Sequence, residues 1–246
     1  MSQIDLITGF LKGRLSQTAK GYVVGVSGGL DSAVVAALCS RIDAHLVLVA
    51  LPCQSSDSAF EDAQLVAEHL GVSLLLADLG RTHDMIVAAT GIDYDKLAAG
   101  NIRSRLRMVA LYAYANQLGL LVAGTSNLTE MTLGYFTKYG DGGVDVEPIA
   151  HLAKYEVRGL ARELGIPKRI IEKAPSADLW KGQTDERELG FSYDDLDGAV
   201  LRLLYQDRAE EMPYGLPSTT PEAMAFVVKA YERTYHKRLP IPSIKR

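Results

Sequence analysis

Hydrophobic positions along the chain fall into four short, nearly continuous runs, separated by longer segments with helical spacing. The runs cover residues 21–26, 45–52, 72–79 and 120–125. Strands that are buried on both faces have this composition, whereas a strand with one solvated face alternates apolar and polar residues. The pattern therefore predicts four strands of a parallel sheet that is covered by helices on both faces.

The segments around these runs repeat apolar residues at the three- and four-residue spacing of a helix. Helices are expected over residues 3–18, 31–42, 56–71, 93–119, 153–165 and 221–238. Alternating strands and helices form right-handed βαβ units, so we expect an α/β fold with a Rossmann-like, doubly wound parallel sheet. Residues 125–147 are expected to be loop-like, residues 174–195 show little regular pattern, and the acidic stretch from Asp185 to Asp197 is expected to face solvent.

Composition narrows the class of protein. The chain has 246 residues, 48% of them hydrophobic, so one domain over residues 1–246 is expected. A net charge of −4 argues against a nucleic-acid partner, whose binding surface would be basic. No apolar run is long enough to span a membrane, and the first residues lack the layout of a secretory signal. Two cysteines without metal-binding spacing fit a reducing, cytoplasmic setting.

The stretch "GVSGGLDS" at residues 25–32 ends the first expected strand and begins a helix. Free backbone N–H groups at a helix N-terminus attract anions, and Gly28 and Gly29 let the backbone approach a ligand closely. No Walker A lysine follows. The stretch also fits the G-x-S-x-G elbow of hydrolases, but that turn needs a sheet built before its serine, and only one expected helix precedes Ser27. An anion site is therefore favoured, with a ligand-free turn as the alternative.

"SGGLDS" resembles the SGGxDS signature of the PP-loop ATP pyrophosphatases, which cleave ATP between the α and β phosphates. The loop of that family holds the departing pyrophosphate. The resemblance implies ATP contacts along the whole loop, from Gly25, Val26, Ser27, Gly28, Gly29, Leu30, Asp31 and Ser32. It does not distinguish NAD synthetases from GMP synthetases, asparagine synthetases or tRNA-modifying enzymes.

Five further segments resemble motifs of the ammonia-dependent NAD synthetases. They are "NIRSRLRM" at 101–108, "GTSNLTE" at 124–130, "GYFTKYGDGGVDVEPI" at 134–149, "KAPSADLWKGQTDERELGFSYDDLD" at 173–197 and "HKR" at 236–238. The third and fourth are long and highly specific. The resemblance implies ATP-dependent amidation of deamido-NAD to NAD by ammonia, through an adenylate, with release of AMP and pyrophosphate. It also implies a homodimer, and the apolar residues on several sides of the helix at 93–117 fit either a subunit contact or a core.

Two acidic residues follow expected strands whose carboxyl ends share one edge of the sheet. Asp31 follows the first strand and Glu130 the fourth, so their carboxylates can converge there and offer Mg²⁺ the hard oxygens it prefers. A solvated loop residue is the alternative for Glu130. The resemblance implies that both bind Mg²⁺, that Ser27, Asp31 and Lys154 are catalytic, and that Thr125, Lys154 and Ser176 contact ATP. Ser176 stands where many relatives carry threonine.

The remaining candidates are charged residues in the matched segments. On the expected helix, Arg103 and Arg107 share a face, while Arg105 points elsewhere. The resemblance implies that Arg105, Lys138, Asp145, His236 and Lys237 contact deamido-NAD; solvated or helix-terminal charges are the alternative. "SNLTE" replaces the "DHAAE" of some members, which leaves the contacts just before Glu130 open.

Ammonia is the expected nitrogen donor. A glutamine-using enzyme needs an amidase domain with a nucleophilic cysteine. Cys39 lies in the apolar helix after the loop and Cys53 follows a strand beside Pro52, so both are expected to be structural. Two alternatives stay open: another amidating or thiolating PP-loop enzyme, and a non-catalytic module that binds an adenine nucleotide. A tRNA-modifying enzyme would show a basic stripe, which the acidic balance of the chain opposes.

Overall fold

The computed structural model describes residues 1–16, 19–54, 57–176, 184–205 and 216–244. The strands are β1 (Gly21–Gly25), β2 (His45–Ala50), β3 (Leu74–Leu76) and β4 (Leu121–Ala123). The helices are α1 (Gln3–Arg14), α2 (Leu30–Cys39), α3 (Asp57–Leu70), α4 (Gly80–Thr90), α5 (Lys96–Leu118), α6 (Leu128–Leu133), α7 (Lys154–Glu163), α8 (Lys168–Ile171), α9 (Asp185–Leu189), α10 (Tyr193–Tyr205), α11 (Pro221–Arg233) and α12 (Tyr235–Arg238). Within the described ranges, no helix has the length and apolar content to cross a membrane.

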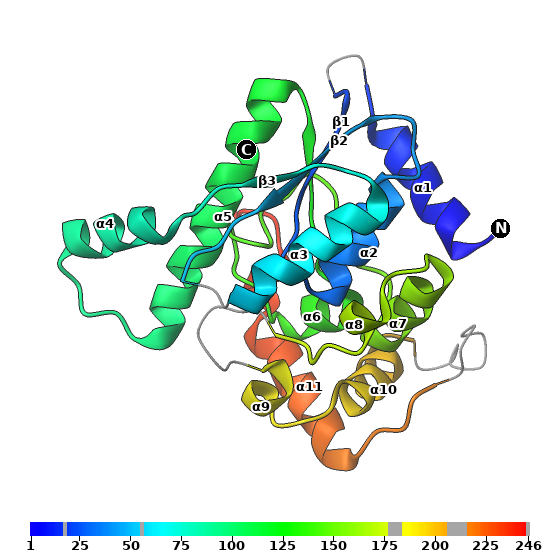
Figure 1. The fold of residues 1–246 in the computed structure, drawn as a ribbon. Coiled ribbons are helices and arrows are strands. Elements are labelled where there is room, and N and C mark those ends of the chain that lie inside the picture. The colour runs from blue at the N-terminus through cyan, green and yellow to red at the C-terminus, as the bar shows by residue number, and fades with distance from the viewer. Residues whose placement is uncertain (17–18, 55–56, 177–183, 206–215, 245–246) are drawn as a thin grey trace.

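The four strands form one parallel sheet in the order β3-β2-β1-β4. The chain builds β1, β2 and β3 outward in one direction and then returns through α5 to place β4 on the other side of β1. Figure 1 shows the strands running side by side, with α5 crossing beside them. The strand order reverses between β1 and β4, and ligands of open α/β sheets bind at such a point. The predicted α/β fold is confirmed.

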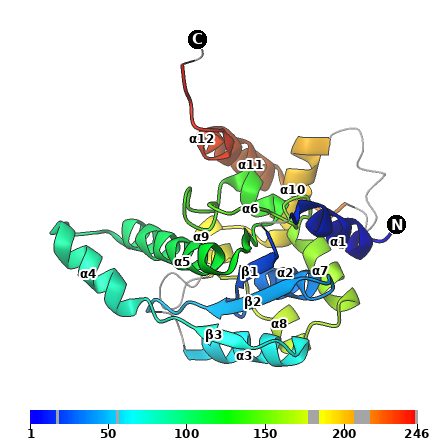
Figure 2. The same ribbon diagram turned by 90° about the horizontal axis from the view of Figure 1, so that it is seen from above.

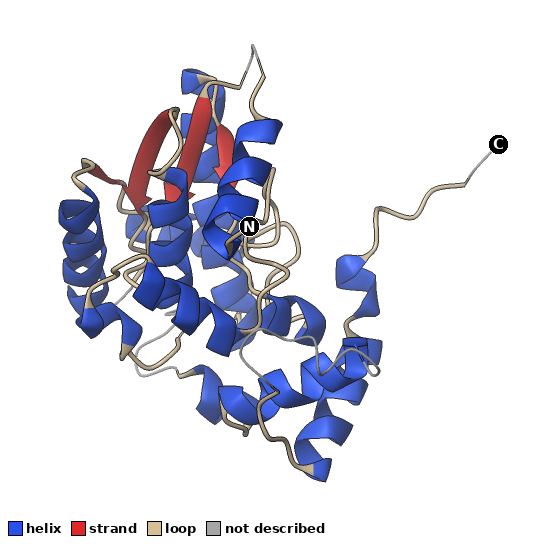
Figure 3. Ribbon diagram, turned by 90° about the vertical axis from the view of Figure 1, so that its right-hand side faces the viewer, coloured by secondary structure: helices blue, strands red, loops and turns tan. Residues whose placement is uncertain are grey.

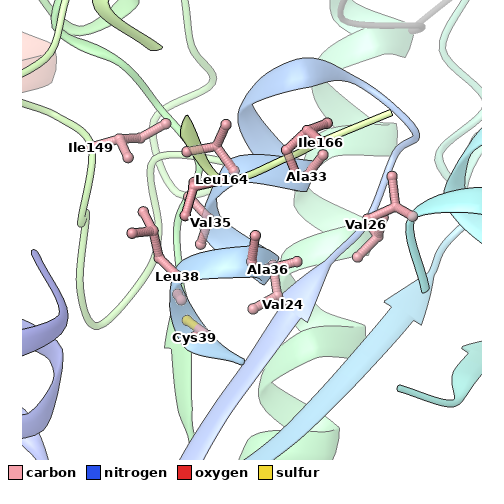
Figure 4. Packing of buried hydrophobic residues seen from close by; sticks show 14 of the residues in the cluster. Val24, Val26, Ala33, Val35, Ala36, Leu38, Cys39, Ile149, Leu164 and Ile166 are labelled. Atoms are coloured by element: carbon pink, nitrogen blue, oxygen red, sulfur yellow. The ribbon is translucent and has the colours of Figure 1, made fainter. Parts of the chain in front are cut away.

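Both faces of the sheet are buried at β1, β2 and β4, as the apolar runs predicted. At the edge strand β3 the prediction is wrong, because Leu75 and Leu76 are 40% and 56% exposed. Successive residues of β1 point to opposite faces: Tyr22 and Val24 join the core beneath α2, while Val23 joins the core beneath α5. Figure 3 shows the strands between helices on either side. Figure 4 shows α2 packed on β1, with Ile149, Leu164 and Ile166 on the side of α2 away from the strand.

A third group of helices lies beyond the carboxyl ends of the strands. Helices α6, α10 and α11 pack around a separate apolar cluster that includes Leu133, Leu196 and Val227. Figures 1 and 2 show this group apart from the sheet, with α11 and α12 beside α6. The group forms one wall over the end of the sheet where β1 and β4 stop.

This region is where the sequence-based expectations are wrong. Residues 125–147 are not all loop, because α6 forms there, and α9 and α10 form within and after the segment judged irregular. Helices α6 and α9 have 6 and 5 residues, too few to show a helical period. Asp185 and Asp197 are 4% and 0% exposed, so the acidic stretch does not simply face solvent. The expected C-terminal helix is divided at Thr234, whose hydroxyl contacts the carbonyls of Ala230 and Leu133.

The loop between β1 and α2 is held by close packing on α3. Gly28 has a left-handed backbone with φ of 72°. A Cβ atom there would lie 2.5 Å from Asp62 Cβ, 2.7 Å from the Ala59 carbonyl oxygen and 2.8 Å from the Ala63 nitrogen. Backbone atoms cannot move aside cheaply, so both the conformation and the contact require glycine at this position.

We predict that Gly28→Ala lowers the free energy of unfolding by roughly 1–3 kcal/mol more than Gly165→Ala does. Gly165 is the matched control because its φ is 75° but nothing lies within 4 Å of its added Cβ. Both variants pay the cost of a left-handed alanine, and only Gly28→Ala adds the overlap with α3. Urea unfolding followed by circular dichroism measures the difference, and equal destabilisation of the two variants would disprove the packing argument.

Candidate active site

A cavity of about 890 Å³ is lined by residues that follow the carboxyl ends of β1, β2 and β4 and by residues of α6, α7 and α11. Its lining includes most of the loop predicted to bind ATP, namely Gly25, Val26, Ser27, Gly29, Leu30, Asp31 and Ser32. Thr125, Glu130, Lys154, Ser176 and Lys237 also line it, whereas Gly28 lies behind the loop against α3. The structure therefore brings most of the predicted ATP-binding residues to one cavity.

The loop is ordered by its two serines. Ser27 Oγ lies 3.2 Å from Ser32 Oγ and accepts a 3.3 Å hydrogen bond from the Gly29 N–H, while Ser32 Oγ donates to the Gly29 carbonyl at 3.0 Å. None of the five histidines, all of which the structure describes, lines the cavity. Ser27 therefore has no imidazole base beside it, and its hydroxyl serves as a hydrogen-bonding group.

A buried lysine connects the two carboxylates predicted to converge. Lys154 Nζ, on the first residue of α7, donates to Asp31 Oδ2 and lies 3.4 Å from Glu130 Oε1. Its side chain is 4% exposed. Burial by itself lowers the pKa of Lys154, but the neighbouring carboxylates of Asp31 and Glu130 outweigh burial and raise it. Burial raises the pKa of Glu130 to about 8, against the opposing effect of Lys154.

Asn127 positions both carboxylates, and sequence reasoning did not single it out. Its side chain accepts the Glu130 N–H at 2.9 Å while Glu130 Oε2 accepts the Asn127 N–H at 3.3 Å, a capping box at the start of α6. Its amide nitrogen also donates to Asp31 Oδ1 at 3.1 Å. The spacing of Asn127 and Glu130 was the available signal, because Asn followed three residues later by Glu marks a helix start.

The turn that carries Thr125 rests on a buried acid. Glu147 Oε2 accepts the Ser126 N–H at 3.1 Å. A Cβ on Gly124 would come within 2.5 Å of the Glu147 carboxylate, so a larger residue there would displace that carboxylate. Burial raises the pKa of Glu147 to about 8. The Glu147 carboxylate therefore fixes the backbone of the turn after β4 through its hydrogen bond with the Ser126 N–H.

Asp197 fixes the N-terminus of α7 and with it the backbone of Lys154. Its carboxylate accepts the N–H groups of Lys154 and Tyr155 at 3.2 and 2.8 Å and the hydroxyl of Thr129 at 2.5 Å. Burial raises the pKa of Asp197 to about 6, although these hydrogen bonds oppose the rise. Asp197 caps α7 only because α10 packs against α7 in the folded chain, so the sequence around Asp197 could not reveal this role.

Two tyrosines extend the polar network beyond Glu130. Tyr193 OH lies 3.1 Å from Asp185 Oδ2 and 3.4 Å from Glu130 Oε1, and the Lys154 ammonium lies 4.9 Å from the centre of its ring. Tyr135 OH donates to Glu188 Oε2 at 2.8 Å. Burial is the main cause of the raised pKa of Tyr193, so the phenol remains a hydrogen-bond donor.

The residues predicted to contact the dinucleotide do not all lie together. Arg105 donates to the Lys138 carbonyl at 3.3 Å, and Lys138 Nζ donates to the His236 carbonyl at 2.7 Å. Lys237, on the cavity lining, donates to the carbonyls of Gly134 and Phe136 at 2.7 and 2.6 Å, and burial lowers its pKa. Asp145 accepts from the Val122 N–H and the Tyr112 hydroxyl. Of the five predicted residues, Lys237 lines the cavity, whereas Arg105, Lys138, Asp145 and His236 lie outside its lining.

The prediction for the three arginines of α5 is confirmed. Arg103 reaches the Gln54 side chain and Arg107 donates to the Leu51 carbonyl, both at the end of β2, whereas Arg105 faces Lys138. Residues four apart lie on the same face of a helix, whereas residues two apart do not, so Arg105 points away from the face that carries Arg103 and Arg107.

Asp31 and Glu130 form a donor set that fits Mg²⁺. Their carboxylates already share one cation, the Lys154 ammonium, which shows that the two can converge on a positive charge. Among the described residues there is no group of three or more histidines, cysteines or acids that could hold a metal ion. Two carboxylates with the remaining positions left to phosphate and water are the usual arrangement for Mg²⁺ in nucleotide sites.

Neither cysteine has the surroundings of a nucleophile. Cys39 is buried in α2, and burial raises its pKa to about 12. Cys53 is also buried, its sulfur lies 3.6 Å from the Leu79 carbonyl oxygen, and burial raises its pKa. Reactive cysteines have a lowered pKa and some exposure, so both residues are structural, as predicted.

Comparison with known proteins agrees with these features. The model of the family described as NAD synthase matches residues 3–241. The NH₃-dependent NAD⁺ synthetase of Thermococcus kodakarensis is 42% identical over 241 residues, covering 97% of this chain and 95% of the relative. An NMN synthetase structure from Francisella tularensis has a TM-score of 0.89 at 32% identity, covering 99% and 98% of the two chains. The NH₃-dependent NAD synthetase structure from Campylobacter jejuni has a TM-score of 0.78 at 27% identity, covering 99% and 96%.

The match spans nearly the whole chain and includes every segment that builds the cavity, from the loop after β1 to α12. The chain belongs to the NAD synthase family.

Proposed function

We propose that the chain is a C–N ligase that amidates deamido-NAD to NAD, using ATP and ammonia. The observation that carries the proposal is the meeting of Lys154, Asp31 and Glu130 beside the SGGLDS loop, in a cavity of about 890 Å³. An anion-binding loop, a buried cation and a pair of acids are what cleavage of ATP to AMP and pyrophosphate requires.

The reaction has two steps. The nicotinate carboxylate of deamido-NAD attacks the α-phosphorus of ATP, the bond to the bridging oxygen of the β-phosphate breaks, and pyrophosphate leaves with that electron pair. Ammonia then attacks the acyl carbon of the adenylate, a proton is released, and AMP departs to leave the amide of NAD. No protein nucleophile takes part, so catalysis consists of positioning and charge stabilisation.

The residues of the loop and its neighbours divide these tasks. The Ser27 and Ser32 hydroxyls and the loop N–H groups hold the phosphates, with Thr125 and Ser176 at the cavity wall. Lys154 supplies positive charge where the bridging oxygen becomes negative. Mg²⁺ bound by Asp31 and Glu130 would neutralise phosphate charge. Lys237 lines the cavity, and it is proposed to bind the dinucleotide together with Arg105, Lys138, Asp145 and His236, which lie outside the lining.

A second candidate is the same amidation on the mononucleotide. The similarity to the Francisella tularensis NMN synthetase, with a TM-score of 0.89, supports it. Both candidates use the same loop and the same chemistry. They differ in whether the second nucleotide of the acid substrate adds binding energy.

We predict that ATP, Mg²⁺ and ammonium release pyrophosphate only when an acid substrate is added. Deamido-NAD is expected to have a higher kcat/KM than deamido-NMN, because Arg105, Lys138 and His236 can contact the second nucleotide. Ammonium is expected to support turnover and glutamine alone is not, since both cysteines are buried. Coupled pyrophosphate release with mass spectrometry of the products measures all arms. A preference for deamido-NMN establishes the second candidate, and pyrophosphate release without either acid refutes both.

We predict that Asp31→Asn and Glu130→Gln each reduce kcat by about 100-fold and raise the Mg²⁺ concentration needed for half-maximal rate. Each substitution keeps the size of the side chain and removes one hard, charged oxygen ligand. Asp43→Asn is the control, because Asp43 is exposed in the turn after α2. Steady-state rates across a Mg²⁺ titration provide the measurement, and an unchanged Mg²⁺ dependence would remove the residue from the metal site.

We propose that the chain forms a homodimer through α4 and α5. Helix α5 has 23 residues, of which only Gly100, Ser104 and Ala115 are buried. Leu97 and Val109 on α5 are 60% and 58% exposed, and Met85 on α4 is 71% exposed. Figure 2 shows the two helices at one side of the molecule. Exposed apolar residues gathered on neighbouring helices are typical of a subunit contact.

We predict that Val109→Glu converts the dimer to monomer at micromolar concentration, because a charge would be buried in an apolar contact. Gln117→Glu adds a charge to an exposed position of the same helix and is expected to leave the dimer intact. Size-exclusion chromatography with light scattering gives the mass of each species. The proposal fails if the unaltered chain is monomeric, and a dimeric Val109→Glu variant would place the interface elsewhere.

A further inference from the structure

Lys173 lies at the loop and is the first residue of the matched segment at 173–197, but the reaction described above assigns it no role. It follows α8, and its ammonium donates to the Gly28 carbonyl at 3.3 Å and forms an ion pair with Asp62 Oδ2 at 2.7 Å. Lys173 lines the same cavity as Ser27 and Gly29. Its side chain is 31% exposed, so a ligand in the cavity can reach it.

Asp62 holds this lysine from the buried side. Its carboxylate is 4% exposed and pairs with Lys173 and also with Arg169 Nε at 2.7 Å. The same residue packs directly behind Gly28. One buried acid thus connects α3, the loop and the segment after α8, and it faces two cations, of which Arg169 also pairs with Glu61 at 3.4 Å.

The charge distribution around the loop explains why a second lysine is useful there. At the Asp31 end, the charge of Lys154 is opposed by Asp31 and Glu130. At the Gly28 end, a loop carbonyl would repel phosphate oxygens, and Lys173 covers that carbonyl with an ammonium. An ammonium can donate up to three hydrogen bonds, and the 31% exposure of the Lys173 side chain at the cavity lining lets an anion in the cavity reach it.

We propose that Lys173 binds the pyrophosphate portion of ATP and the departing pyrophosphate, and that Asp62 positions it. The inference rests on the proposed function, because it concerns the phosphates of the same ATP. Lys173 contacts the ligand, whereas Asp62 acts through Lys173. Lys173 supplies positive charge at the Gly28 end of the loop, and Lys154 supplies it at the Asp31 end.

The test is calorimetric titration of the protein with inorganic pyrophosphate in the presence of Mg²⁺. Lys173→Met keeps the length of the side chain and removes its charge, so the Kd is expected to rise roughly 10-fold or more, the value of one charge-assisted hydrogen bond. Lys173→Arg is expected to retain most of the affinity. The control is Lys168→Met, on α8, whose lysine is 82% exposed and is expected to leave the Kd within about twofold.

A double-mutant cycle separates positioning from general structure. Asp62→Asn is expected to raise the Kd for pyrophosphate in the presence of Lys173, and to change it less than about twofold in the Lys173→Met background. An equal loss in both backgrounds overturns the role of Asp62. A Kd within about twofold of the unaltered chain for Lys173→Met, or no pyrophosphate binding by the unaltered chain, overturns the proposal.

A measurement on the unaltered chain tests the proposal even if a variant fails to fold. Acetylation of Lys173, followed by mass spectrometry, is expected to fall when pyrophosphate is added, while acetylation of Lys168 does not change. Equal modification with and without pyrophosphate contradicts the proposal. Product formation is assayed separately. If Lys173 contributes to pyrophosphate binding but no NAD is formed, only the proposed reaction is refuted. If NAD is formed and pyrophosphate binding does not depend on Lys173, only this inference is refuted.

Discussion

The arrangement of the site depends on a buried ammonium held between two carboxylates. Lys154 and Asp31 are 123 positions apart in the sequence, and both lie in the first turn of a helix, as Glu130 does in α6. Three helix N-termini therefore point at one place. Carboxylates in a first helical turn are stabilised by the helix dipole, whereas a lysine there is not. The two acids and the Asp197 cap on α7 offset that disadvantage, so the three helices depend on one another.

A buried ion pair of this kind is not a strong argument for stability. Removing two charges from water costs several kcal/mol per ion, and a well-packed apolar group in the same place is often as stable. Removing one partner is a different matter, because the other charge is left buried without compensation. The apolar cores on the two faces of the sheet and around α10 and α11 supply the favourable burial that allows such a cluster to persist. The cluster is consistent with use by a ligand that brings charge of its own.

The sequence predicted the features that local pattern determines. The apolar runs identified all four strands, and the strand-to-helix turn identified the loop, because both signals lie within a few residues. Asp185 and Asp197 could not be placed in the same way. Both are buried by contacts with segments far away, Asp197 through the N–H groups of α7 and Asp185 through Tyr135 and Tyr193. An acidic stretch has the same composition whether its residues cap another helix or face water, so only tertiary contacts distinguish the two.

Position in the topology explains why the same short loop could not be a hydrolase elbow. A serine nucleophile needs a base that is already positioned, and the Ser27 hydroxyl instead interacts with Ser32 and Gly29 within its own loop. The first strand ends beside β4, where the chain has crossed the sheet, so the groups that face the loop come from α6 and α7. Those groups are two acids and a lysine rather than an imidazole. They suit the binding of a polyphosphate and the stabilisation of a leaving group, and this environment, more than the glycines, determines what the loop can do.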